Sequence, residues 1–179
     1  AYVYSLTPML RRVLTALSLA SLLTLACASG PTFKNNVFDD GVVRYRVGAL
    51  PASFRRIEVD ENDLAWNDPD YGTIGINATC TEYEDVPEVA LVNHLLFGTA
   101  ERDFRLEETA TLDGRGARHV IVDLELDGVP VTIEIYLVRK DGCVYDLTFI
   151  AARDRFERGR SMFAEFARAF AVLQTQIGR

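Results

Sequence analysis

The chain has 179 residues, of which 49% are hydrophobic and 25% are charged, a composition typical of one globular domain with short appendages. Arg11 and Arg12 are the only charged residues among the first 27. The chain has 19 basic and 26 acidic residues in all, so 17 basic and 26 acidic residues follow residue 27, with a net charge near −9. Binding to a phosphate backbone depends on lysine and arginine, so this balance argues against nucleic acid as a partner.

The N-terminal residues have the pattern of an export signal. From Met9, two arginines precede an apolar stretch of about 13 residues, shorter than the roughly 20 residues that span a bilayer. Residues 23–27 (LTLAC) resemble the lipobox of bacterial lipoproteins, in which the cysteine is acylated and becomes the new N-terminus. The resemblance implies lipidation at Cys27 and attachment to a lipid bilayer. An ordinary signal peptide and a buried apolar helix are the alternatives.

These features divide the chain into four expected parts. Residues 1–8 lie upstream of the expected start, 9–26 form the lipoprotein signal peptide, 27–36 contain the lipidated Cys27 and a tether, and 37–175 form the domain. Ala28, rather than aspartate, follows the cysteine. By resemblance to lipoprotein sorting, this residue implies a location in the cell envelope at the outer membrane, facing the periplasm.

Beyond the tether, hydrophobicity alternates with the period of β-strands. Strands are expected at residues 42–47, 54–59, 73–80 and 104–112, with a turn cluster at 67–72. Pro87 begins a predicted helix over residues 87–97, which Gly98 ends.

Three further strands are predicted near residues 120–126, 129–137 and 143–149. Asp127-Gly128 is a two-residue hairpin signal, which pairs residue 126 with 129, 124 with 131, 122 with 133 and 120 with 135. All eight of these residues are apolar, so turn and pattern agree. For the next hairpin we predict a three-residue loop at 140–142, because it pairs 139 with 143, 137 with 145, 135 with 147 and 133 with 149, and so keeps one apolar face. A two-residue turn at Asp141-Gly142 would set apolar residues opposite polar ones.

The last predicted element is an amphipathic helix over residues 153–173. Its apolar stripe consists of Phe156, Met162, Phe163, Phe166, Phe170 and Leu173. We expect this stripe to cover the apolar face of the sheet. The predicted fold class is therefore α+β: an antiparallel sheet of about six to seven strands, covered by a long C-terminal helix and a shorter mid-chain helix.

This order of elements resembles the PsbP-like fold, shared by the photosystem II extrinsic protein PsbP and the Ran-binding Mog proteins. The resemblance covers about residues 42–173 and is strongest over 128–170, where YDLTFI (145–150) leads into DRF (154–156) and the Phe-rich helix. The run is also similar to bacterial lipoproteins that carry a PsbP-like domain. Members of this fold mostly act as assembly or binding partners, which implies a non-catalytic module. No motif matches the functional residues of PsbP or Mog, so none is carried over.

Two cysteines remain once Cys27 is assigned to the anchor. Cys80 and Cys143 both fall on apolar faces of predicted strands, and an exported compartment permits a disulfide between them. Two separate buried thiols are the alternative. No second cysteine or histidine lies at zinc-ligand spacing from either residue, so no metal site is predicted there.

One row of polar residues is a candidate ligand face. The predicted registers place His119 beside Tyr136, and Tyr136 beside Asp146, on the sheet face opposite the Phe-rich helix. Such a row could bind a small polar ligand or move a proton. It is also typical of an ordinary polar row on a half-exposed sheet, stabilised by cross-strand pairs.

The sequence contains no Gly-x-Ser-x-Gly nucleophile motif, no lysine-bearing phosphate loop and no EF-hand. We therefore predict no catalytic residue, metal or cofactor. The leading hypothesis is a membrane-tethered interaction or assembly module with a protein partner in the envelope. The alternative is a lipoprotein that binds a small ligand or metal on the face with His119, Tyr136 and Asp146.

Two observations would separate these hypotheses. An exposed flat patch would favour the interaction module; its expected members are Ile121, Tyr136, Val138, Val144 and Ile150. A pocket lined by titratable groups with perturbed pKa values would favour ligand binding or chemistry.

Overall fold

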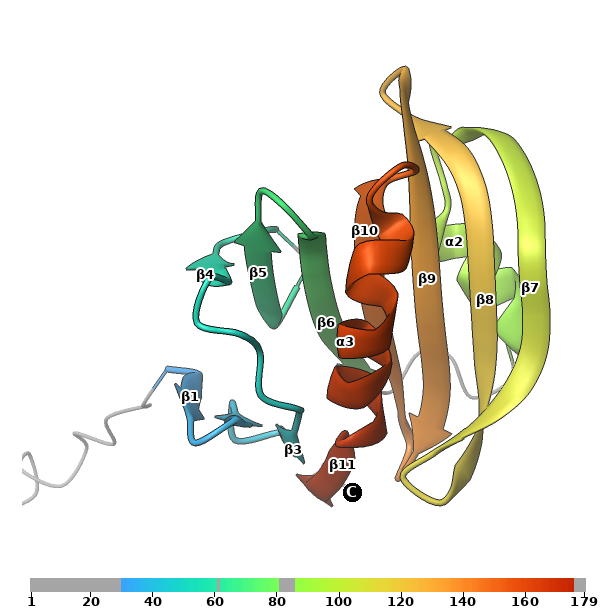
Figure 1. The fold of residues 1–179 in the computed structure, drawn as a ribbon. Coiled ribbons are helices and arrows are strands. Elements are labelled where there is room, and N and C mark those ends of the chain that lie inside the picture. Colours follow the sequence, from blue (N-terminus) through green and yellow to red (C-terminus); the bar gives the residue numbers. More distant parts are fainter. Residues whose placement is uncertain (1–29, 61, 81–85, 176–179) are drawn as a thin grey trace, which may run out of the picture. The chain divides into compact units, whose positions relative to one another are not determined.

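The computed structural model describes residues 30–60, 62–80 and 86–175, so the expected signal peptide and Cys27 lie outside the described residues. Their main feature is a seven-stranded antiparallel sheet in the order β4-β5-β6-β10-β9-β8-β7 (Figure 1). Its strands are β4 (Arg55–Ile57), β5 (Leu64–Asp68), β6 (Gly72–Cys80), β7 (Ala100–Leu112), β8 (Arg115–Leu126), β9 (Val129–Lys140) and β10 (Cys143–Ala152). The predicted α+β class and the size of the sheet are confirmed.

A second, four-stranded sheet was not predicted. Its order is β1-β2-β3-β11, and its strands are β1 (Thr32–Lys34), β2 (Val37–Asp39), β3 (Val43–Arg46) and β11 (Ala171–Thr175). The prediction of one helix over residues 153–173 is wrong in length, because α3 spans only Phe156–Arg168. Beyond it the chain pairs antiparallel with β3. Phe170 is buried between the two elements, with its ring centroid 5.9 Å from that of Tyr45.

Three hairpins connect β7, β8, β9 and β10, and each turns at an Asp-Gly pair. The backbone φ angles are 47° and 72° at Asp113-Gly114, 53° and 78° at Asp127-Gly128, and 52° and 77° at Asp141-Gly142. Two consecutive left-handed residues are the requirement of a two-residue type I′ turn. The predicted β8–β9 register is confirmed, since Leu126 pairs with Val129 and Val120 pairs with Ile135.

The predicted three-residue loop between β9 and β10 is wrong. Lys140 pairs with Cys143, and Leu137 pairs with Asp146, across a two-residue turn. The register was misjudged because both faces of this hairpin are buried, so each strand has apolar residues on either side. The apolar pattern is therefore compatible with both registers, and the two-residue turn at Asp141-Gly142 sets the one that is observed.

A helix packs on each face of the seven-stranded sheet (Figure 1). The helix α3 covers Tyr145, Leu147 and Phe149, and it approaches closely, because a Cβ at Gly159 would lie only 2.4 Å from Cζ of Phe149. The helix α2 (Glu88–Leu95) packs on the other face, which carries Val120, Val122 and Ile135. The expectation that the Phe-rich helix covers that second face is thus wrong. Within residues 30–60, 62–80 and 86–175, no helix is long and apolar enough to cross a membrane.

Candidate functional site

A cavity of about 520 Å³ lies on the α2 face of the sheet. It exists because α2 has only eight residues and its buried residues pack against β8 and β9. The helix therefore leaves part of the neighbouring strands β10 and β6 uncovered. The volume is within the usual range for small-molecule sites. We call this space the α2 cavity.

The α2 cavity has an apolar part and a polar part. The apolar lining comes from β9, β10 and α2: Ile133, Ile135, Leu137, Val144, Ile150, Leu91, Leu95 and Leu96. The polar lining comes mainly from β6, β10 and the loop before β5: Asn77, Thr79, Asp146, Thr148, Asp60, Asn62 and His94 of α2. No lysine or arginine is among these residues. The arrangement suits a ligand with an apolar body and a polar end.

Asp146 is a buried acidic residue in the lining of the cavity. The register places it between Leu137 of β9 and Asn77 of β6, and it is 8% exposed. Its carboxyl group makes no hydrogen bond or ion pair with any described residue. Buried polar groups normally have such a partner, so an unpartnered carboxyl facing a cavity is a feature to explain.

Burial raises the pKa of Asp146 to about 7, and the nearby Asp63 carboxylate adds to the rise. Because the folded chain binds this proton more tightly than the unfolded chain, the contribution of Asp146 to stability falls as the pH rises from about 4 toward 7. Asp146 therefore disfavours the folded state at neutral pH, which is typical of residues kept for binding rather than for stability.

Asp63 is a second carboxyl group, near enough to Asp146 to raise its pKa. Asp63 accepts a hydrogen bond of 3.0 Å from the hydroxyl of Tyr45, and burial raises the pKa of Asp63 to about 6 despite that bond. The loop that carries it lies close to the sheet at Gly75. A Cβ at Gly75 would lie 2.9 Å from Oγ1 of Thr148 and 3.0 Å from Oδ1 of Asn62. A side chain at position 75 would therefore push this wall of the cavity outward.

The three residues of the predicted ligand face are not together. His119 pairs with Tyr136 as expected, and their rings stack with centroids 4.1 Å apart. Asp146, however, pairs with Leu137 and lies on the opposite face, because the β9–β10 register differs from the predicted one by one residue. His119 and Tyr136 lie on the α3 face, where the ring of Tyr136 is 5.8 Å from that of Phe163.

His119 belongs instead to a cluster with the buried Glu134 and the exposed Glu108. Its Nδ1 lies 2.9 Å from Oε1 of Glu108, and its Nε2 lies 2.8 Å from Oε1 of Glu134. Burial alone would lower the pKa of His119, but hydrogen bonding and charge from Glu134 and Glu108 outweigh it and raise that pKa. Burial, together with the Glu134 carboxylate, raises the pKa of Tyr136 to about 12. With His119 only 5% exposed and Glu134 1%, this cluster is a structural charge network rather than an open site.

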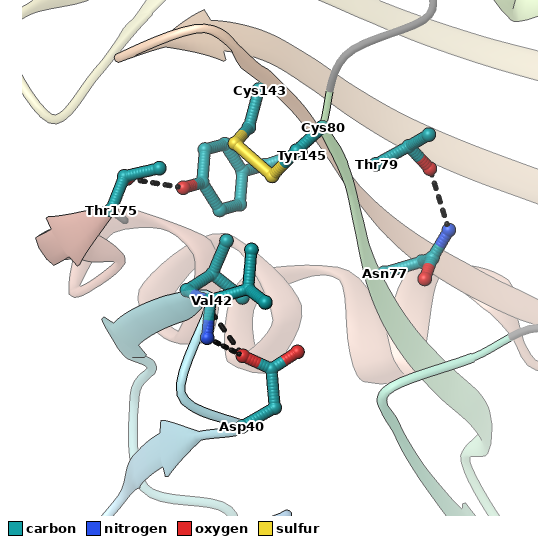
Figure 2. Close-up of a disulfide and its surroundings, with 9 residues drawn as sticks. Asp40, Val42, Asn77, Thr79, Cys80, Cys143, Tyr145 and Thr175 are labelled. Atoms are coloured by element: carbon teal, nitrogen blue, oxygen red, sulfur yellow. Dashed lines mark hydrogen bonds between the residues drawn. A yellow bond between two sulfur atoms is a disulfide. The ribbon is translucent and has the colours of Figure 1, made fainter. Parts of the chain in front are cut away.

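The predicted disulfide between Cys80 and Cys143 is present (Figure 2). The two residues are directly opposite each other on β6 and β10, with Cα atoms 4.1 Å apart. The bond lies on one side of β6, while Asn77 and Thr79, joined by a 3.3 Å hydrogen bond, lie on the other. The disulfide thus ties together the two strands that carry Asn77, Thr79 and Asp146.

The predicted exposed patch is absent. Ile121, Val138 and Val144 are 2%, 0% and 8% exposed, and the five predicted members are divided between the two faces of the sheet. In the part of the chain that the structure describes, no group of three or more His, Cys, Asp or Glu residues could hold a metal ion.

Sequence reasoning identified Asp146 but missed its neighbours. Asn77 and Thr79 meet Asp146 only through the pairing of β6 with β10, which no short turn specifies. Glu134 could have been found, since the correctly predicted β8–β9 register places it one row from His119.

No protein-family model and no curated protein matches the chain. The solved structures that share its fold include three with a TM-score of 0.51. The first is a cyanobacterial PsbP (CyanoP) from Synechocystis sp. PCC 6803, with 13% sequence identity over 83% of this chain and 95% of that chain. The second is LpqN of Mycobacterium tuberculosis, described as involved in cell envelope biogenesis, with 14% identity over 82% of this chain and 90% of that chain. The third is a protein from Bacteroides thetaiotaomicron VPI-5482, with 10% identity over 73% of this chain and 45% of that chain. At these identities the likeness concerns the fold, and the expected PsbP-like fold is confirmed.

Proposed function

We propose that this chain is a lipid-anchored, non-catalytic module of the cell envelope that binds a small ligand in the α2 cavity. The observation that carries the proposal is the buried, unpartnered Asp146 in the lining of a cavity of about 520 Å³. Small-molecule sites are concave and combine apolar side chains with polar groups that orient the ligand, and the α2 cavity has both kinds of lining. A lining group with a perturbed pKa also favours ligand binding, and Asp146 is such a group.

The structure favours this function over a purely protein-binding role. The protein-interaction hypothesis depended on an exposed apolar surface, and the residues assigned to it are mostly buried. An envelope location is supported by the lipobox-like segment at residues 23–27 and by the Cys80–Cys143 disulfide, which suits an oxidising compartment. The shared fold with LpqN is consistent with that location.

The first test concerns the anchor. Cys27→Ser is expected to abolish labelling by a fatty-acid probe and to release the protein from membranes, because the acylated sulfur would be lost. Labelling and membrane fractionation of the full chain measure both effects. A variant without Cys80 and Cys143 is the control and should label normally. Continued labelling of the Cys27→Ser chain would show that the anchor assignment is wrong.

The second test concerns the cavity. Thr148 lies half-buried on its floor, so Thr148→Trp should fill much of the space. Full-length protein is purified from its native envelope and extracted with solvent, and mass spectrometry compares what each variant carries. We expect a small molecule bound to the wild type to be depleted at least about tenfold, the equivalent of 1.4 kcal/mol of binding free energy.

The matched control is Thr111→Trp, which makes the same replacement at an exposed position of the edge strand β7, outside the cavity. It should carry as much of the molecule as the wild type. Equal amounts in all three proteins, with Thr148→Trp folded, would contradict binding in the α2 cavity.

A further inference from the structure

The charges around the α2 cavity limit what it can hold. Among the described residues, the charged or titratable ones in its lining are Asp60, Asp146 and His94, and Asp63 lies close enough to act on Asp146. No lysine or arginine is among the described lining residues, so an anionic ligand would meet repulsion from the carboxyl groups of Asp60, Asp63 and Asp146. A carboxylate or phosphate ligand is therefore disfavoured.

A metal ion fits the cavity poorly as well. Hard cations need several oxygen ligands at short distance, and no such cluster of acidic, histidine or cysteine side chains is found among residues 30–60, 62–80 and 86–175. The lining also includes eight apolar side chains, which would give nothing to a hydrated ion. The occupant must have both an apolar body and a group that satisfies one buried carboxyl.

The chemistry of Asp146 indicates which polar group the ligand carries. It is more than nine-tenths buried, it lines the cavity, and it has no partner among the described residues. A neutral hydroxyl group could donate one hydrogen bond to it. An ammonium group could donate as well and would also balance the charge, and charge-assisted bonds of this kind are about twice as strong as neutral ones. Asn77 and Thr79 lie on the neighbouring strand, where their side-chain oxygens can accept the remaining donors.

We propose that the ligand is an organic cation, with an ammonium group bound to Asp146 and an apolar body against the β9 and α2 side of the cavity. This inference rests on the proposed function of the cavity as a binding site. It specifies the ligand by charge: a primary amine with an apolar body of modest size.

The cation also makes binding dependent on pH. Burial holds the pKa of free Asp146 near 7, and the nearby Asp63 carboxylate adds to the rise. The other described titratable groups in the cavity lining are Asp60 from the loop before β5 and His94 from α2. An ammonium group favours the ionised form, so binding releases the proton from Asp146. Affinity is therefore expected to fall as the pH falls from 8 to 6.

The test uses three probes of similar size and different charge. These are 2-phenylethylammonium, 2-phenylethanol and 3-phenylpropanoate, titrated calorimetrically into the full chain in lipid nanodiscs, with empty nanodiscs as the blank. The ammonium probe is expected to bind at least about tenfold more tightly than the alcohol, and the carboxylate least of all. Asp146→Asn should weaken the ammonium probe at least about tenfold and leave the alcohol unchanged.

The control is Asp103→Asn, which removes the same charge at an exposed position of β7, outside the cavity. It should leave all three affinities unchanged. If the alcohol or the carboxylate binds as tightly as the ammonium probe, or if Asp146→Asn has no effect, the cation inference is wrong while the cavity remains a binding site. If none of the three binds, the cation inference is also wrong, and the Thr148→Trp comparison decides the proposed function independently.

Discussion

Replacing Cys80 and Cys143 together by alanine is expected to lower the free energy of unfolding by about 4 kcal/mol. The bond joins residues 63 positions apart, so without it the unfolded chain regains the entropy of a long closed loop. The two cysteines also pack in the aromatic core beneath α3, and Oη of the adjacent Tyr145 lies 3.3 Å from Oγ1 of Thr175 in β11 (Figure 2). Urea unfolding followed by circular dichroism measures the loss.

Reduction of the wild-type chain should reproduce most of this effect, since it opens the same loop. Cys27→Ser, which removes a cysteine outside the bond, should leave the stability unchanged. A loss below about 1 kcal/mol in the double variant would contradict the disulfide, because a loop of this length accounts for more in the chain-entropy model.

Glu134→Ala is expected to destabilise the fold by about 3 kcal/mol at pH 6. It removes a buried carboxylate from the 2.8 Å contact with His119 and leaves a buried imidazolium with Glu108 as its remaining partner. The control is Glu107→Ala, which breaks the pair of Glu107 with Arg118. Because the side chain of Glu107 is 43% exposed, that change should cost at most about 1 kcal/mol.

The effect of Glu134→Ala should depend on pH. The folded-state pKa of His119 lies above its unfolded value of about 6.5, so the stabilisation by the imidazolium is complete below that pH and is lost as the pH rises through the folded-state pKa. The difference between wild type and variant should therefore be larger at pH 6 than at pH 9. Unfolding curves at the two pH values measure it. A difference that grows with pH would contradict the assigned charge of His119.

Local sequence signals predicted the sheet well where the turn and the apolar pattern agreed. Asp127-Gly128 fixed the pairing of β8 with β9, and Leu124 opposite Val131 confirms it. At Asp141-Gly142 the same turn chemistry was present, but the apolar rows of β9 and β10 favoured the other register. Since helices cover both faces, a match of apolar rows was not evidence for either one.

The candidate site could be predicted only in part because it is built from non-local contacts. Asp146 was predicted as part of a row with His119 and Tyr136, but its face depended on the β9–β10 register. The cavity around it depends on the pairing of β6 with β10 and on the short length of α2. No local sequence pattern specifies the pairing of β6 with β10. The strand β11 was missed for a similar reason. The apolar period of α3 continues through Phe170, but the helix ends at Arg168 and the chain pairs with β3 from Ala171 onward.

The most direct test of the binding role is a crystal structure of the protein purified from its native envelope without refolding. We expect electron density for a non-protein molecule in the α2 cavity, with a donor atom within hydrogen-bonding distance of the Asp146 carboxyl group. A wild-type cavity that contains ordered water alone, with a bound molecule elsewhere on the domain, would contradict it.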